Sequence, residues 1–188
     1  MTQLSEITLV TGNADKLAEW QAIFGNQLEL KNKALDIEEI QGDGDLQRIL
    51  EHKARAAYDA LQSPVIVEDI ALCIDKFSGM PGPFVKYFLK DKASKSALWN
   101  LVGHEESRAT IICSAAFYDG NQLTTAEGRV DGYIVKPRGE RGFGFDFTFQ
   151  PYGGDTRTFA EMSLEEKNAI SHRTLAIKSL LEKLSELN

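Results

Sequence analysis

A glycine and a basic residue just after an apolar run could bind a phosphate. The apolar run 7–11 ends at Thr11 and is followed by Gly12 and Asn13, and asparagine suits the N-cap of a helix. The first backbone N–H groups of a helix have no partner within it, so they form an anion site, and glycine allows close backbone approach. Lys16 falls in the first turn, where a cation opposes the helix dipole by about 0.3–1 kcal/mol. Either a phosphate lies beside Lys16, or the segment is an ordinary cap with a solvated lysine.

Two groups of carboxylates could hold a divalent cation. One group closes a second apolar run and the other lies in an extended segment; they are Glu68 and Asp69, and Asp36, Glu38 and Glu39. Carboxylates that are brought together repel one another, which raises a pKa or requires a hard cation. Proteins hold Mg²⁺ through one or two carboxylates plus substrate phosphates, which this set could supply. The alternative is that these acids only face water at the ends of elements.

Further basic side chains are candidates for ligand binding; they are Lys53, Lys86, Lys167, His172 and Arg173. Each lysine, taken alone, is typical of a surface residue whose methylene groups cover apolar side chains. His172 and Arg173 follow Ser171, which suits the N-cap of the last helix, so both would sit at the wrong end of that helix dipole for a cation. The guanidinium of Arg173 could bind a carbonyl or a phosphate with two N–H groups. None of the three histidines has a metal-ligand spacing, so no zinc site is expected.

The segment Phe143-Gly144-Phe145-Asp146, which follows Gly142, could bind a base. Its glycines give the backbone freedom between two aromatic rings, which suits stacking of a base while an amide or carboxylate faces the base edge. A tight turn with two core aromatics is the alternative.

Composition excludes several classes of protein. A formal charge of −7 and a pI near 5.1 argue against sequence-independent nucleic-acid binding, which needs spread basic surface. No apolar run approaches the roughly 18 residues of a membrane span, and no secretory signal is visible. Two cysteines are too few for a disulfide framework and indicate buried thiols in a reducing compartment. We therefore expect a cytoplasmic protein without nucleic-acid or membrane partners.

Hydrophobic periodicity predicts an α/β chain. The expected strands are 7–11, 64–69, 108–118 and 122–135, and the last two form a hairpin. The expected helices begin after Asn13, at about 45, 83 and 94, and at about Ser171. Strands that alternate with helices and also pair as a hairpin favour a mixed sheet over an all-parallel one.

Together and in this order, these features resemble the inosine triphosphate pyrophosphatases, also called the non-canonical purine nucleoside triphosphate pyrophosphatases. The matching text is LVTGNADKLAEW, DIEEIQG, VIVEDIALCI, GMPGPFVKYFL, RGFGFDFTFQP and TFAEMSLEEKNAISHRTLA. These blocks run from residue 8 to 177, so the resemblance covers nearly the whole chain, and the last block is highly specific. The GMPGPFVKYFL block is nearer the eukaryotic form of the family than the usual bacterial one.

The resemblance implies a fold and an activity. The fold is an elongated mixed β-sheet with flanking helices and two lobes around a central cleft, so residues 1–188 would form a single domain with two lobes. The activity is Mg²⁺-dependent conversion of ITP, XTP and their deoxy forms to monophosphate and pyrophosphate, with Mn²⁺ as a substitute for Mg²⁺. The resemblance also implies a homodimer.

The resemblance assigns residues by motif. Thr11, Gly12, Asn13 and Lys16 match the phosphate-binding loop, joined by Lys53 and Lys86, and Lys16 is also placed with the catalytic residues. Glu39 and Asp69 match the metal-site acids, and Asp69 also matches the general base. The base and ribose pocket is matched by Phe143, Gly144, Phe145, Asp146, Lys167, His172 and Arg173.

This sequence departs from the family pattern at Ile70, Phe145 and Phe147, where the family usually has a small or hydroxyl residue, a Trp or Tyr, and a Pro. These departures leave other readings open. One is a nucleotide-binding regulatory module with little turnover. Another is a related pyrophosphatase with a different base preference, and a third is a phosphatase that releases orthophosphate.

Overall fold

The computed structural model describes residues 6–25, 29–38, 40, 45–89, 95–153 and 155–186. Glu39, one of the two predicted metal-site acids, lies outside these residues. The strands are β1 (Glu6–Val10), β2 (Glu29–Lys33), β3 (Val65–Ile74), β4 (Pro81–Gly82), β5 (Ser107–Tyr118), β6 (Leu123–Ile134) and β7 (Phe149–Pro151). The α-helices are α1 (Ala14–Phe24), α2 (Leu46–Leu61), α3 (Val85–Phe88), α4 (Ala97–Leu101), α5 (Leu164–Ile170) and α6 (His172–Glu186). Short 3₁₀ helices span Asp75–Phe77, Gly144–Phe147 and Phe159–Glu161.

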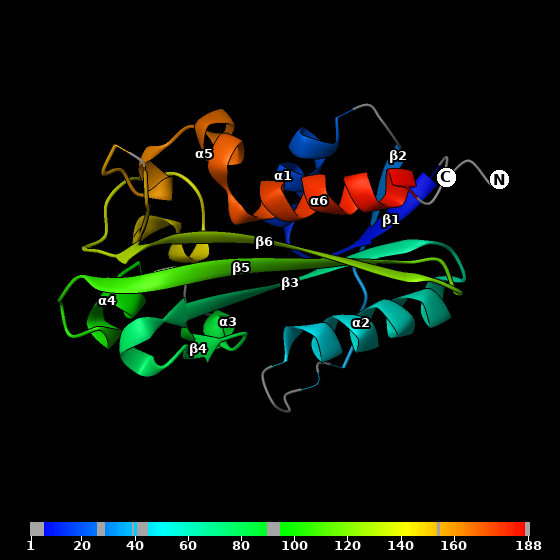
Figure 1. The fold of residues 1–188 in the computed structure, drawn as a ribbon, viewed down its shortest axis with the longest axis horizontal. Coiled ribbons are helices and arrows are strands. Elements are labelled where there is room, and N and C mark those ends of the chain that lie inside the picture. Colours follow the sequence, from blue (N-terminus) through cyan, green and yellow to red (C-terminus); the bar gives the residue numbers. More distant parts are fainter. Residues whose placement is uncertain are drawn as a thin grey trace. The chain divides into compact units, whose positions relative to one another are not determined.

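Within the described residues, seven strands form one mixed sheet in the order β2-β1-β3-β5-β6-β7, with β4 paired to β3. Strand β1 is parallel to β2 and to β3, whereas β4 is antiparallel to β3 and β7 is antiparallel to β6. The predicted mixed α/β sheet with flanking helices is therefore confirmed (Figure 1). Among the helices that the structure describes, none is long and apolar enough to cross a membrane.

The chain divides into two compact units. Unit 1 comprises Met1–Asp69, Cys113–Gly128 and Arg173–Asn188, and unit 2 comprises Ile70–Ile112 and Arg129–His172. Strands β3, β5 and β6 each contribute residues to both units.

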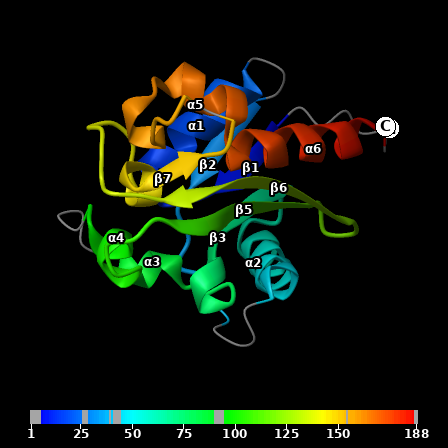
Figure 2. The same ribbon diagram turned by 60° about the vertical axis from the view of Figure 1, so that its left-hand side comes forward.

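Helices cover both faces of the strands in unit 1. The buried residues Leu50, Ala54 and Ala57 recur along α2 at helical spacing and pack with strand residues such as Val67. Figure 1 and Figure 2 show α1 and α6 on the side of these strands opposite to α2. Helix α1 turns Trp20 fully inward. Because both faces are covered there, β1 and the first residues of β3 read as short apolar runs.

A loop of unit 2 is tied to a 3₁₀ helix. The backbone N–H groups of Glu140 and Arg141 both donate to the carbonyl of Ala160, at 3.2 and 3.1 Å. The side chain of Arg138 reaches the carboxylate of Glu161 at 3.0 Å. The loop over residues 138–141 is thus held by backbone and side-chain contacts. In both views α3 and α4 lie on one side of β5 and α5 on the other (Figures 1 and 2).

Several predicted starts of elements are confirmed. The side chain of Asn13 caps α1, and the side chain of Asp45 caps α2. The predicted hairpin forms β5 and β6, and its turn is closed by the Asp119 carboxylate, which accepts two backbone N–H bonds. The last helix begins at His172, directly after Ser171.

The predicted end of the strand at 64–69 is wrong. Strand β3 continues to Ile74, so Glu68 and Asp69 lie in the middle of the strand rather than in a loop after it. The reason is that apolar side chains continue beyond the two acids and that β4 pairs with Leu72 and its neighbour. Carboxylates inside an apolar strand must be placed by partners, which makes their contacts informative.

The helix expected over 83–89 is shorter than predicted. It spans Val85–Phe88, and Phe84 rather than Pro83 occupies the position before it. The helix expected from Ser94 is described only from Ala97 to Leu101.

We predict that Gly139→Ala destabilises the protein more than Gly153→Ala. Both glycines have positive φ, at 84° and 71°, so each alanine costs about 1–2 kcal/mol in backbone strain. At Gly139 an added Cβ would lie 2.3 Å from the backbone carbon of Ala160, whereas no described heavy atom lies within 4 Å of one at Gly153. Overpacking should add about 1–3 kcal/mol at Gly139 alone. Urea unfolding of the two variants measures the difference, and equal losses would contradict it.

Candidate functional site

Glu68, in the middle of β3, is the centre of a group of buried charges in unit 1. We call Lys16, Glu19, Glu68 and Arg173 the ion cluster. The Glu68 side chain is 2% exposed, and its Oε1 lies 2.9 Å from the Lys16 ammonium and 3.0 Å from Arg173 Nη2. Its Oε2 accepts hydrogen bonds from Arg173 Nε at 2.9 Å and from the indole N–H of Trp20 at 2.6 Å. The guanidinium therefore binds Glu68 with two parallel hydrogen bonds, the strongest geometry for this pair.

Arg173 also joins a second carboxylate. Its Nη1 donates to Glu19 Oε2 of α1, and the Arg173 side chain is 2% exposed. Burial works to lower the pKa of Arg173, but the charges of Glu68 and Glu19 raise it above its ordinary value. The two carboxylates thus explain why a cation lies in the first turn of α6, at the unfavourable end of the helix dipole.

The charges of the ion cluster keep Glu68 ionised. Burial alone would raise the pKa of Glu68, but the positive charges of Arg173 and Lys16 hold it well below its ordinary value. Burial and the Glu68 charge raise the pKa of the neighbouring Cys113 well above its ordinary value, so this thiol stays protonated. Its Sγ lies 3.9 Å from Glu68 Oε2.

Lys53 and Asp69 belong to the same part of unit 1. The ammonium of Lys53 donates to the backbone carbonyl of Glu68 at 3.0 Å. Burial lowers the pKa of Lys53, the charge of Asp69 opposes this shift, and the charge of Lys16 adds to it. The charges of Lys16 and Asp69 both act on Lys53, so these three side chains share one electrostatic environment.

The turn between β1 and α1 has the predicted form. The Asn13 carboxamide oxygen accepts the N–H groups of Asp15 at 2.9 Å and Lys16 at 3.2 Å, and the Asn13 N–H donates to Thr11 Oγ1 at 3.1 Å. Gly12, between these residues, is exposed. Since three amides of this turn already have partners, an anion here would bind other groups of the turn and the Lys16 side chain, or displace the Asn13 side chain.

The residues predicted for the base form a second group, in unit 2. Asp146 Oδ2 lies 2.6 Å from the Lys167 ammonium and accepts the backbone N–H of Phe143 at 2.9 Å. The Lys167 ammonium also lies 5.0 Å from the ring centroid of Phe143 and 5.5 Å from that of Phe159. Asp146 and Lys167 are both buried, so this ion pair and the two rings fix the loop that precedes Gly144.

His172 lies against the aromatic side chains of the same unit. Its ring centroid is 5.7 Å from that of Phe145 and 6.2 Å from that of Phe159. His172 thus connects Phe145 with Phe159, and Lys167 connects Phe143 with the same ring. Phe159 was not among the residues selected from the sequence.

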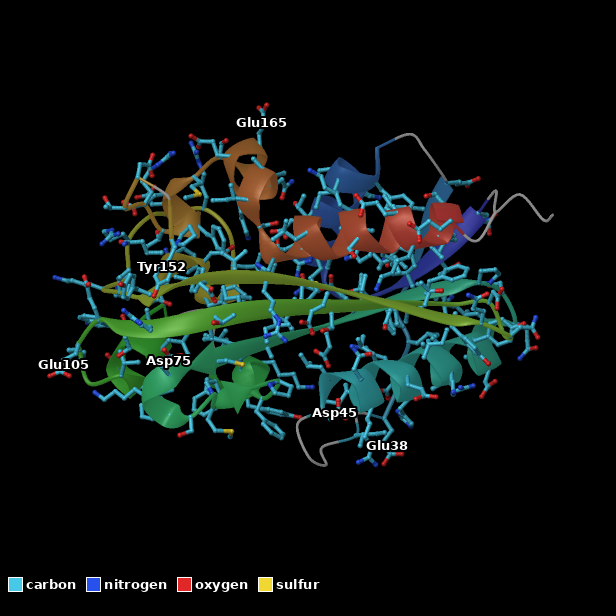
Figure 3. All side chains as sticks on the ribbon, in the orientation of Figure 1. Glu38, Asp45, Asp75, Glu105, Tyr152 and Glu165 are labelled. Carbon is cyan, nitrogen blue, oxygen red and sulfur yellow. The ribbon has the colours of Figure 1, made fainter. Side chains whose placement is uncertain are left out.

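Three further candidates from the sequence are Lys86, Glu38 and Glu39. Lys86 of α3 is exposed, with its ammonium 4.9 Å from the ring centroid of Tyr87. Glu38 is exposed, and its side chain lies on the α2 side of unit 1 (Figure 3). Glu39 is not described. Among the residues that are described, no group of three or more His, Cys, Asp or Glu could hold a metal ion.

Neither Glu19 nor Trp20 was selected from the sequence as a site residue. Lys16, Glu19 and Trp20 are three and four residues apart, so they share one face of the helix. The available signal was that a lysine and a glutamate share a helix face with an apolar indole, which indicates buried charges. Of the two cysteines predicted to be buried thiols, Cys113 is buried, whereas for Cys73 the prediction is wrong, because it is only half-buried.

A mixed α/β sheet with lysines and carboxylates gathered beside a strand-to-helix turn is an arrangement that suits an anionic ligand. The chain belongs to the Ham1 family, whose model matches residues 7–183. It is similar to inosine triphosphate pyrophosphatase 2 of Trypanosoma cruzi, with 43% identity over 177 residues, 93% of this chain and 90% of that protein.

Solved structures are similar over the same extent. The Ham1 protein of Staphylococcus aureus matches with a TM-score of 0.80 and 27% identity, covering 97% of this chain and 100% of that one. The nucleoside-triphosphatase, dITP/XTP pyrophosphatase, of Mycobacterium abscessus matches with a TM-score of 0.69 and 29% identity, covering 94% and 98%.

We predict that Arg173→Ala lowers the free energy of unfolding by about 3–5 kcal/mol, because it leaves the buried Glu68 and Glu19 without their guanidinium. Arg157→Ala is the matched control, since Arg157 also binds two carboxylates, those of Asp155 and Glu166, but at the surface. Its loss should be much smaller. Urea unfolding at neutral pH compares the two variants, and similar losses would show that the ion cluster is not a buried network.

Proposed function

We propose that this chain hydrolyses ITP, dITP and XTP to the nucleoside monophosphate and pyrophosphate. The observation that carries the proposal is the near full-length match to a relative named inosine triphosphate pyrophosphatase, at 43% identity. The gathering of Lys16, Lys53 and Asp69 in unit 1 supports it, because a triphosphate needs cations near a base that can activate water.

The proposed metal site fits the residues only in part. Asp69 offers a half-buried carboxylate near Lys53, whereas Glu68 is occupied by the ion cluster. A site of one or two carboxylates completed by substrate phosphates needs no third protein ligand. We assign Asp69 and Glu39 as the residues that would hold Mg²⁺, or Mn²⁺ in its place. When bound, the cation would neutralise charge on the phosphates.

The chain's own residues supply the rest of the reaction. Asp69 takes a proton from the water whose oxygen forms a bond to the α-phosphorus, while the bond from that phosphorus to the bridging oxygen breaks. Lys16 and Lys53 balance the charge that develops on the leaving pyrophosphate. Thr11, Gly12, Asn13 and Lys86 are proposed to bind the phosphates with them.

The base is proposed to be bound by the unit 2 group. Phe143 and Phe145 offer aromatic faces, and Lys167 and His172 offer donors for the 6-oxo group that hypoxanthine and xanthine have and adenine lacks. Gly144 and Asp146 shape the loop. Arg173 is proposed to bind the nucleobase or ribose, as the resemblance implies, and also to hold the ion cluster together.

Two further proposals concern context. The resemblance leads us to expect a homodimer. The cysteine content leads us to expect a cytoplasmic location. Neither Cys73 nor Cys113 is in a disulfide, which is the state expected in a reducing compartment.

We predict that a panel of ITP, XTP, GTP, ATP and dUTP with Mg²⁺ yields pyrophosphate from ITP and XTP. ATP should react roughly 10⁴-fold more slowly, because donors placed for a 6-oxo group are left unpaired. Pyrophosphate and orthophosphate are measured separately. A chelator should stop the reaction, and Mg²⁺ or Mn²⁺ should restore it.

The other outcomes of this panel are equally informative. Nucleotide binding without product would indicate a regulatory module. Release of orthophosphate would indicate a phosphatase, and a preference for dUTP would indicate a different base specificity. Each of these results contradicts the proposed function.

We predict that Asp69→Asn lowers kcat for ITP by roughly 10²-fold or more, since the amide cannot accept the proton from water. Asp75→Asn is the control, because Asp75 is an exposed carboxylate in a 3₁₀ helix of unit 2 (Figure 3). Initial rates of pyrophosphate release test both variants. Full turnover by the folded Asp69→Asn variant would remove Asp69 as the base.

A further inference from the structure

We propose that Glu68 is a positioning residue that holds the Lys16 ammonium in place for the triphosphate, and that it is not a metal ligand. The inference rests on the proposed function, in which Lys16 binds phosphate. It goes beyond that function because neither the metal-site acids nor the proton acceptor includes Glu68.

The contacts of Glu68 leave little capacity for a metal ion. A carboxylate has about four acceptor positions, and here Lys16, Trp20 and both nitrogens of the Arg173 fork occupy them at 2.6 to 3.0 Å. A cation at Glu68 would have to displace at least one charged partner from a site that is 2% exposed. Asp69, the next residue along the strand, is half-buried, and its charge acts on Lys53. The two adjacent acids therefore have separate roles.

Lys16 is the one member of the ion cluster that combines a buried partner with solvent access. Its side chain is 21% exposed, whereas those of Glu19, Glu68 and Arg173 are 2–4% exposed. An ammonium has three N–H donors, and Glu68 takes one of them. A lysine has four rotatable side-chain bonds, and pairing with a fixed carboxylate restricts them before the ligand arrives. The entropy cost of binding a phosphate to Lys16 is therefore lower.

The carboxylate that fixes Lys16 is itself fixed from two elements. Trp20 and Glu19 come from the same face of α1 as Lys16, and Arg173 comes from the start of α6. The partners of Glu68 thus fix the orientation of its carboxylate. The fixed carboxylate in turn fixes the position of the Lys16 ammonium. The cluster has two positive and two negative charges, so it is neutral as a whole.

The test uses Glu68→Asp, which keeps the charge and withdraws the carboxylate by one methylene group. In the otherwise unchanged protein we expect kcat/KM for ITP to fall about 10-fold, because the order of Lys16, which binds the phosphates and balances charge on the leaving group, is lost while the base is kept. In a Lys16→Met background the same substitution should have no further effect on kcat/KM. A purely structural role would cost the same in both backgrounds, and that result would overturn the proposal.

A second measurement does not depend on turnover. The rate at which an amine-acylating reagent modifies Lys16, relative to the exposed Lys178, should rise several-fold in Glu68→Asp, and peptide mass spectrometry measures both sites. An unchanged ratio would overturn the proposal. If the unsubstituted protein releases no pyrophosphate from ITP, the proposed function fails, while this ratio still tests the pairing.

Folding of Glu68→Asp is checked by urea unfolding. If it does not fold, Trp20→Phe carries the same two measurements, because it removes one donor from Glu68 and keeps the aromatic packing against Phe24. Its effects should be smaller and in the same direction. No change in either measurement would overturn the proposal.

Discussion

The ionised carboxylate of Glu68, buried inside a strand of unit 1, is the interaction on which the rest of this unit depends. A buried charge costs several kcal/mol unless it is paired and hydrogen-bonded, so the chain must bring partners to it. Those partners come from α1 and from α6, which is 105 residues away along the chain. Both helices must therefore pack on the same side of β3, because the Glu68 carboxylate needs its partners and because apolar side chains must be buried. This packing places Lys16 beside the strand.

Much of the fold could be predicted because it follows from local patterns. The apolar spacing of α2 and the caps Asn13 and Asp45 are local, and so is the turn at Asp119. The end of β3 could not be predicted, because two adjacent acids resemble the end of a strand when their partners are unknown. The apolar residues after the acids are a local sign that the strand continues, but the long-range ion pair and the pairing with β4 leave no local mark in the sequence.

The same division applies to the site. Motifs were sufficient to select Lys16, Lys53, Asp146, Lys167 and Arg173, all of which are engaged in described contacts. Motifs did not show that several of these residues bind one another. Asp146 pairs with Lys167, and Arg173 pairs with Glu68, because a buried cation needs a carboxylate whether or not a ligand is present. From the sequence, Lys16 was interpreted as a phosphate-binding or a solvated lysine, and Arg173 as a group for a carbonyl or a phosphate. The structure provides a carboxylate for each of these two cations at the unfavourable end of a helix dipole.

Stability alone does not account for such a cluster. Replacing a buried ion network with apolar residues of similar volume is often neutral or stabilising, so the network is a poor device for holding two helices together. An apolar contact, however, cannot orient an ammonium. A bidentate guanidinium fixes the carboxylate of Glu68, and the carboxylate in turn fixes the direction of a lysine that retains solvent access. Burying the ion cluster costs free energy, and this cost is best explained by the position that the cluster gives to Lys16. Lys16 is thus the residue that connects the fold of unit 1 with the proposed chemistry.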